Sequence, residues 1–514
     1  MEQQGLQLSD LYTLAPELTL VIAAIVISLI DLFIPKQVNR SLLGWLTLAS
    51  IIVSGVFVSL QIGPTSLIDP ANPESGELLN LLGGSYRVDN FANLLKLILL
   101  GSTGLIILMS IGSVKEEDIP HKGEFYYFFL PAVLGAMITA SSGDLITLFV
   151  GLELLSITSY IMVGMRKKDH KSNEGAFKYA ILGAVSSATI LYGMSFLYGM
   201  SGSTNLMAIN AALQQADPSF SALIYVSFFL LLAGFGFKIA AAPFHNWAPD
   251  VYQGAPTPVT AFLAVVSKAA GFAILFRVMY GVFYGNSGTP EHPIGEDAFF
   301  SLSVLAAIAM IIGNVTALRQ KNAKRLLAYS GIANAGYLLV PIATQFSLVH
   351  YTNFSEFAYY LLAYALMNIG AFAVLLIIER STGSSEIRGY AGLYYRAPWT
   401  AAAMVLLILS LAGIPVTGGF FGKLFILMGT LQNQTYWLAA IMLATSVVSY
   451  YFYFSIIRQM FMRSDESSPI RTTPTLGITI WICTIGTVAM GAYPQGVLGW
   501  IQDMFKLTRD LFIG

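Results

Sequence analysis

Long apolar runs separated by short polar segments dominate this sequence. A transmembrane helix needs about 20 mainly apolar residues to cross a hydrocarbon core of about 30 Å. Segments of this kind lie at about 12–34, 41–62, 90–113, 124–141, 143–165, 174–200, 221–247, 257–284, 298–318, 324–344, 355–379, 397–430, 435–460 and 473–494. The run at 397–430 is too long for one straight crossing, which indicates a bend or break. The pattern predicts an all-α polytopic membrane protein with about 14 transmembrane helices.

The composition supports this fold class. Hydrophobic residues make up 56% of the chain and charged residues 11%, with a mean hydropathy of +0.69. Soluble domains carry about 25% charged residues, so few charges remain here for a water-facing surface. The N-terminal MEQQGLQLSD has no basic segment. The first apolar run is therefore expected to be a retained span rather than a signal peptide.

Several functional classes are disfavoured by the charge and by missing motifs. The net charge of −1 gives no basic surface for a nucleic acid. The single cysteine, Cys483, cannot hold an iron–sulfur cluster alone, since a cluster takes about four ligands. The five histidines are scattered, and no GxGxxG or Walker motif occurs. We therefore expect no cofactor and no metal bound by this chain.

The basic residues predict the orientation, because they alternate between loops. One side receives 18 of them: Lys36, Arg40, Lys115, Lys122, Arg166, Lys167, Lys168, Lys171, Arg319, Lys321, Lys324, Arg325, Arg380, Arg388, Arg396, Arg458, Arg463 and Arg471. The other side receives three: Arg87, Lys506 and Arg509. Cytoplasmic loops are enriched in Lys and Arg. The side with 18 is thus predicted to be cytoplasmic, and both termini to be non-cytoplasmic.

Four ionisable residues fall near the middle of predicted spans: Glu153, Lys238, Lys268 and Lys423. Such groups are costly in a bilayer and are usually functional. The alternatives are a carboxylate that is hydrogen-bonded between helices, and lysines that reach the interface. Glu153 lies roughly 15 Å from either end of its span, too deep to reach water, and a lysine side chain spans only about one helical turn. We interpret the four residues as a candidate transport pathway.

Other polar residues within spans give weaker signals. His245 follows Pro243 and is a candidate proton relay, because the unperturbed pKa of histidine is near 6.5; a packed structural histidine is the alternative. Arg277 is expected to pair with an acid or a headgroup. Lys178 and Lys96 lie near span ends and are expected to reach the interface.

Two helix breaks accompany the buried lysines. Pro243 follows Lys238, and a cluster of glycines with Pro415 precedes Lys423. Interrupted helices in corresponding halves point to a transporter site. The breaks fall in the seventh and twelfth spans, which suggests two inverted five-helix repeats. The predicted organisation is a three-helix segment at 1–123, repeats at 124–284 and 298–460, and a C-terminal helix and tail at 461–514.

A family resemblance rests on several segments. GFGFKIAAAPFHNWAPDVYQGAPTPVTAFLAVVSKAAGFA, LFVGLELLSITSYIMVG, EGAFKYAILGAVSSATILYG, KRLLAYSGIANAGYLL and SLAGIPVTGGFFGKLFIL resemble subunit 2 of complex I-type NAD(P)H-quinone oxidoreductases, in order and spacing. The sequence as a whole is most similar to cyanobacterial and plastid versions. This similarity implies a thylakoid membrane with lumenal termini, plastoquinone as the acceptor and a part in photosynthetic electron transport. The resemblance implies other membrane subunits, a peripheral redox arm and lipids as partners.

The same resemblance implies roles for the four residues. Glu153 would pair with Lys238, Lys268 would connect the two halves, and Lys423 would be the terminal lysine. Protons would pass between them, driven by redox chemistry in other subunits. Three alternatives are a stand-alone cation/proton antiporter, a purely structural scaffold, and a quinone-binding redox subunit.

Overall fold

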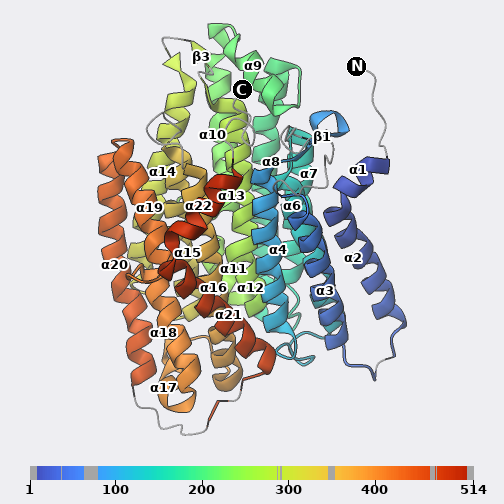
Figure 1. Cartoon of the computed structure of the whole chain (residues 1–514), viewed down its shortest axis with the longest axis vertical. Coiled ribbons are helices and arrows are strands. Elements are labelled where there is room, and N and C mark those ends of the chain that lie inside the picture. Colours follow the sequence, from blue (N-terminus) through green and yellow to red (C-terminus); the bar gives the residue numbers. More distant parts are fainter. Residues whose placement is uncertain are drawn as a thin grey trace.

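A computed structural model describes residues 8–35, 37–62, 79–285, 288–289, 292–344, 353–462, 469–470 and 472–505. Within these ranges the chain is a bundle of nearly parallel and antiparallel helices (Figure 1). Thirteen helical segments are long and apolar enough to span a membrane, and a shorter apolar helix, Pro398–Ala412, completes a fourteenth crossing. The predicted all-α fold with about 14 crossings is confirmed.

The N-terminal part supplies three crossings. A short helix, α1 (Leu8–Thr13), leads into α2 (Ala15–Phe33), α3 (Ser41–Ser59) and α4 (Asn90–Ser110). Between α3 and α4 lie an antiparallel pair, β1 (Leu79–Leu81) and β2 (Tyr86–Val88), and the 3₁₀ turn η1 (Leu82–Gly84). The carboxylate of Asp89 begins α4 by accepting a hydrogen bond from the Ala92 amide at 2.7 Å, as an N-cap residue does.

The next five crossings form the first half of the predicted transporter core. They are built from α5 (Lys122–Tyr127), α6 (Phe129–Ala140), α7 (Leu145–Val163), α8 (His170–Ser201), α10 (Ser221–Lys238), α11 (Ala248–Gly254), α12 (Thr257–Phe262) and α13 (Lys268–Val278). The helix through α12 and α13 contains two π-helical stretches, η3 (Leu263–Ser267) and η4 (Met279–Phe283). Two small elements, α9 (Leu206–Gln214) and η2 (Pro218–Phe220), join α8 to α10.

The remaining crossings follow a short pair, β3 (Gly288–Thr289) and β4 (His292–Pro293). They are α14 (Ile294–Ala317), α15 (Ala323–Ala343), α16 (Asn353–Thr382), α18 (Pro398–Ala412) with α19 (Gly418–Gln432), α20 (Tyr436–Phe461) and α21 (Pro474–Ala492). The 3₁₀ turn η5 (Ile387–Tyr390) and α17 (Leu393–Arg396) precede α18, and α22 (Pro494–Met504) ends the described chain.

Both predicted helix breaks are present. α10 ends at Lys238 and the next helix starts at Ala248, so the seventh crossing is interrupted around Pro243. α18 ends at Gly413, which has φ +82°, a left-handed conformation that glycine adopts without strain. The twelfth crossing resumes at Gly418. The interpretation of the two halves as inverted repeats stays a prediction.

Burial separates the central helices from the peripheral ones. In an apolar 18-residue stretch of each span, all residues of Thr257–Phe283 and 94% of those of Ala323–Ala343 are buried, whereas in Ala15–Phe33 the share is 22%. The centre of the bundle is therefore formed by α12–α13, α15 and α16, with α2, α3 and α20 outside. Helices on the outside meet lipid or partner chains, and the helices at the centre carry several buried charges, among them Lys268, Arg277 and Lys324.

Candidate functional site

Glu153 and Lys238 meet between α7, α8 and α10. The Lys238 Nζ lies 3.9 Å from a carboxylate oxygen of Glu153. It donates hydrogen bonds to Ser156 at 2.8 Å and to Ser187 at 3.4 Å. The Ser187 hydroxyl in turn donates to Glu153. Ser187 therefore bridges the acid and the amine, so the pair interacts both directly and through a hydroxyl group.

The break in its helix also stabilises the charged form of Lys238. It is the last residue of α10, where carbonyl groups lack helical partners and the helix dipole favours a cation. The indole of Trp247, beyond the break, donates to the carbonyl of Phe237 at 2.9 Å. The break thus creates a local environment that can hold an ammonium group inside the bundle.

Lys268 lies at the centre of the molecule, directly after the π-helical stretch of η3. Its ammonium donates to the carbonyl of Gly331 on α15 at 2.6 Å, and the residue is 1% exposed. A Cβ on residue 331 would lie 2.8 Å from this ammonium and 3.1 Å from the hydroxyl of Tyr364. Glycine at 331 therefore leaves the space that the lysine and the tyrosine share.

Lys423 occupies the second break. Its ammonium donates to the carbonyls of Leu411 and Ala412, at the C-terminal end of α18, at 3.2 and 3.3 Å. It also lies 4.8 Å from the centre of the Tyr337 ring, a cation–π distance. Gly413 makes room, because a Cβ there would be 3.1 Å from the lysine side chain. Lys238 and Lys423 thus both lie at the C-terminal ends of half-helices.

Polar side chains of α15 fill the interval between Lys268 and Lys423. Next to Gly331, the Ser330 hydroxyl lies 2.5 Å from that of Tyr453. One turn further, Asn334 donates to the Ser330 carbonyl at 2.8 Å and accepts from the hydroxyl of Tyr360. The ring of Tyr337 then reaches Lys423. One helix therefore carries a series of polar contacts from the central lysine to the terminal one.

His245 lies in the first break but apart from the lysine hydrogen bonds described above. Its ring packs against Tyr329 with centroids 6.2 Å apart. Its Nδ1 has no hydrogen-bond partner within the described part of the chain. The relay role predicted for His245 stays a prediction.

The other charges within spans form pairs outside this pathway. Arg277 forms a buried ion pair with Asp89 at 2.7 Å, which confirms the expected acidic partner. Lys96 does not reach the interface as expected: it is fully buried and pairs with Glu17 on α2 at 2.8 Å. Lys178 pairs with Glu174 at 2.6 Å and Asp250 at 2.8 Å. Apart from the contact of Lys178 with Glu174, which lies within α8, these pairs join different helices.

Sequence reasoning missed the uncharged members of the site. Ser156, Ser187, Asn334 and Tyr337 are ordinary residues for membrane helices, so their types alone give no signal. The spacing of Ser330, Asn334 and Tyr337 along one helix is the only local hint. Within the described residues, no three His, Cys, Asp or Glu side chains come together as metal ligands.

Comparison with known proteins identifies the family. The profile described as NADH:quinone oxidoreductase/Mrp antiporter, transmembrane, matches residues 142–449, which include all four predicted site residues. The chain belongs to this family. The matched residues include both broken helices and the helix α15 between them. The three buried lysines therefore lie within the part of the chain that defines the NADH:quinone oxidoreductase/Mrp antiporter family.

Full-length relatives support the assignment. NADH-quinone oxidoreductase subunit N of Paenibacillus sp. is 53% identical over 510 residues, covering 98% of each chain. Subunit N of Brevibacillus brevis is 46% identical, covering 99% of this chain and 98% of the relative. A chain of respiratory complex I from Thermus thermophilus with bound aureothin is 31% identical, with a TM-score of 0.76 over 94% of this chain and 98% of that one.

A further structural neighbour shows how widely the fold occurs. A chain of the Mrp complex from Dietzia sp. shares 18% identity with a TM-score of 0.81, covering 99% of both chains. At this identity the likeness concerns the fold alone. The named relatives of the family come from Paenibacillus and Brevibacillus, and they do not support the predicted similarity to cyanobacterial and plastid versions.

Proposed function

We propose that this chain is the antiporter-like membrane subunit of an NADH-quinone oxidoreductase and that it conducts protons across the membrane. The observation that carries the proposal is the set of buried amines: Lys238, Lys268 and Lys423 each lie inside the bundle, and the first pairs with Glu153. Buried ionisable groups in a membrane protein mark ion and proton pathways. The relatives named as subunit N supply the reaction class.

The proposed proton path follows these groups. When Glu153 moves away from Lys238 or is neutralised, the ammonium of Lys238 loses a favourable charge and releases its proton. Lys268 accepts the proton, and it passes along the polar side of α15 to Lys423, which releases it on the other side. Moving one charge against 100 mV costs about 2.3 kcal/mol. The redox reaction in other subunits supplies this energy, and this chain needs no redox centre of its own.

The surroundings of Glu153 favour a multi-subunit assembly. Its side chain is 24% exposed and lies on a stripe of α7 whose other members are exposed and apolar: Ile146, Val150, Ile157 and Ile161. A carboxylate facing lipid is costly. We therefore propose that a neighbouring membrane subunit covers this face of α7, and that peripheral subunits carry the electrons.

The electron acceptor is proposed to be a respiratory quinone in a bacterial cell membrane. The predicted thylakoid location and plastoquinone acceptor rested on the resemblance to cyanobacterial and plastid versions. The named relatives from Paenibacillus and Brevibacillus give that resemblance no support, and their names point to NADH as the donor.

Extraction of the tagged chain in mild detergent tests the proposal. We expect the chain to run in a large assembly that reduces a quinone with NADH and that pumps protons when reconstituted in vesicles. A chain that runs alone, or only with other antiporter-like chains, and has no reductase activity would contradict the proposal. It would favour the stand-alone cation/proton antiporter, which predicts Na⁺-sensitive growth on deletion.

Replacing Ser187 by alanine tests the bridge between Glu153 and Lys238. We expect pumping per electron to fall about tenfold, because a hydrogen bond to a charged group is worth roughly 1.5–3 kcal/mol. The measurement is proton uptake and NADH oxidation in inside-out vesicles. Ser195→Ala on the exposed side of the same helix is the control and should behave as wild type. Equal pumping by both variants would rule out a role for the bridge.

A further inference from the structure

A charged pocket opens at the predicted cytoplasmic end of the bundle, outside the pathway described above. Its volume is about 450 Å³. Cationic side chains line it, namely Lys115, Arg166, Lys168 and Arg380, together with the acids Glu117, Asp118, Asp169 and Glu379. The lining residues come from four connections at the predicted cytoplasmic side, or from the helix ends next to them. These connections are α4–α5, α7–α8, α11–α12 and α16–α17. The pocket therefore brings water and charge to the end of the central helices.

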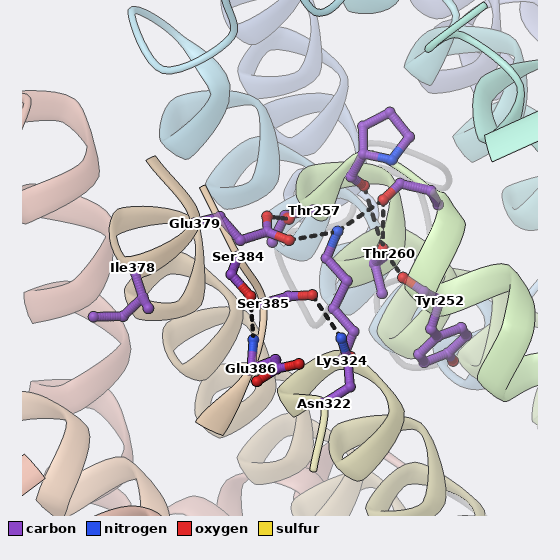
Figure 2. A network of polar contacts seen from close by, with 12 residues as sticks. Tyr252, Thr257, Thr260, Asn322, Lys324, Ile378, Glu379, Ser384, Ser385 and Glu386 are labelled. Carbon is purple, nitrogen blue, oxygen red and sulfur yellow. Dashed lines mark hydrogen bonds and ion pairs between the residues drawn. The ribbon is translucent and has the colours of Figure 1, made fainter. Parts of the chain in front are cut away.

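Glu379 is one of the side chains that line this pocket. Its carboxylate pairs with the Lys324 ammonium at 2.9 Å and accepts a hydrogen bond from Thr257 (Figure 2). The same ammonium donates to the carbonyl of Ala255, where α11 ends, at 3.0 Å. Figure 2 shows the two side chains pointing at each other between α12, α15 and α16. The ion pair therefore joins the wall of the pocket to α15.

The two partners differ in their access to water. The Glu379 side chain is 14% exposed, whereas that of Lys324 is 1% exposed. Glu379 also lines the pocket, and Lys324 does not. A proton that arrives from the pocket can therefore reach the Glu379 carboxylate directly, whereas Lys324 lies behind it.

The interior side of the pair leads toward Lys268. Lys324 and Gly331, whose carbonyl binds the ammonium of Lys268, are seven residues apart on α15. Seven residues are two turns, so both lie on one side of the helix about 10 Å apart. Between them on that side lie Leu327 and Ala328, both buried, and Ala328 contributes only a methyl group.

Buried polar atoms without partners surround this interval. The hydroxyls of Tyr252 and Tyr364 and the side-chain oxygen of Asn368 are fully buried, and none has a hydrogen-bond partner within the described residues. Tyr364 shares the space at Gly331 with Lys268, and Tyr252 lies on α11, which packs against α15. Buried polar groups normally have a partner, often water. These groups therefore provide hydrogen-bonding positions between the pocket and Lys268.

We propose that Glu379 is the group through which protons enter this chain from the cytoplasm, with Lys324 as its gating partner. This inference rests on the proposed function. A proton from water in the pocket binds the Glu379 carboxylate, and the neutral acid loses its attraction to Lys324. The proton then passes through the hydroxyls of Tyr252 and Tyr364, with water between them, to the amine of Lys268 after Lys268 has given its previous proton to Lys423. Lys238 recovers the proton that it released by the same route. The carboxylate is restored and pairs with Lys324 again.

The test compares Glu379→Gln with Glu386→Gln in the intact complex. Glu386 is an exposed acid seven residues further along the chain, on the segment beside Lys324, and it serves as the matched control. Proton uptake and NADH oxidation are followed in inside-out vesicles as the external pH is raised. We expect pumping by Glu379→Gln to fall at least about tenfold, since an amide cannot accept the proton, and Glu386→Gln to pump as wild type.

Two further variants separate proton entry from a purely structural ion pair. Glu379→Asp keeps an acid, so it should pump protons. The external pH at which its pumping declines as the medium is made more alkaline should differ from that of wild type. The double variant Lys324→Gln/Glu379→Gln leaves no unpaired charge, so it should assemble and still pump poorly. Normal pumping by Glu379→Gln or by the double variant, or an unchanged pH profile for Glu379→Asp, would overturn the inference.

The proposed function has its own readout in the same vesicles. If wild-type and Glu386→Gln vesicles pump while Lys423→Ala vesicles do not, the proton-conducting function stands whatever Glu379→Gln does. If wild-type vesicles reduce quinone without pumping, the proposed function fails, and the inference on Glu379 fails with it.

Discussion

Replacing Lys423 by alanine is expected to lower proton pumping by at least about a hundredfold, in the range usual for loss of a proton-transfer group. The amine is the ionisable group placed at the carbonyl end of α18, where Leu411 and Ala412 accept its hydrogen bonds. Alanine leaves those carbonyls in place but removes the proton carrier. The measurement is proton uptake per NADH oxidised in inside-out vesicles.

The interpretation of this variant depends on assembly. Among the described residues no acid pairs with Lys423. The alanine variant therefore removes a buried positive charge and leaves no buried carboxylate without its partner. The native mass of the complex should therefore stay unchanged. Lys171→Ala, at an exposed lysine, is the control. Pumping at the wild-type ratio by an assembled Lys423→Ala complex would exclude Lys423 from the pathway.

Replacing Arg277 by alanine is expected to have the largest effect on stability. The guanidinium holds the Asp89 carboxylate at 2.7 and 2.8 Å, donates to the carbonyl of Ala140, and stacks 4.5 Å from the ring of Phe91. Both charged side chains are fully buried. Without Arg277 the buried Asp89 carboxylate keeps the more distant guanidinium of Arg87, 3.5 Å away, as an ionic partner. Breaking a buried pair costs about 3–5 kcal/mol. The unfolding temperature of the purified complex or chain should drop.

A double variant distinguishes charge from packing. Asp89 is also the N-cap residue of α4, and asparagine caps helices as well as aspartate does. Asp89→Asn/Arg277→Met removes both charges and keeps the cap, but it also takes the carboxylate away from the buried Arg87. It should therefore recover only part of the lost stability. Arg319→Ala, at an exposed arginine, should unfold at the wild-type temperature. If Arg277→Ala also unfolds at the wild-type temperature, the buried ion pair contributes little to the stability of the chain.

The crossings and their breaks could be predicted from the sequence because their causes are local. Twenty apolar residues are enough to predict a span, and Pro243 or the cluster around Pro415 is enough to predict an interruption. The depth of Glu153 and the three lysines follows from counting residues along each span. These features need no knowledge of which helices are neighbours.

The contacts of the site could not be predicted because they join distant segments. The partner of Lys96 is Glu17, and the bridge from Glu153 to Lys238 is Ser187 on a third helix. Serine and tyrosine are common in membrane helices, so Ser187 and Tyr364 do not stand out before the helices are packed. The pairing of Lys324 with Glu379 was missed for the same reason, since Lys324 was counted only as a basic residue of the cytoplasmic side and Glu379 only ends a predicted span.

The second helix break has a consequence for how the chain enters the membrane during synthesis. α18 and α19 have fifteen residues each, which is about 22 Å and short of a bilayer core of about 30 Å. α19 also carries Lys423, a residue type that the insertion machinery admits reluctantly. Both half-helices pack against α16 and α21. The ribosome synthesises α21 after this segment. Stable insertion of α18 and α19 is therefore expected only after α21 has been made and packs against them.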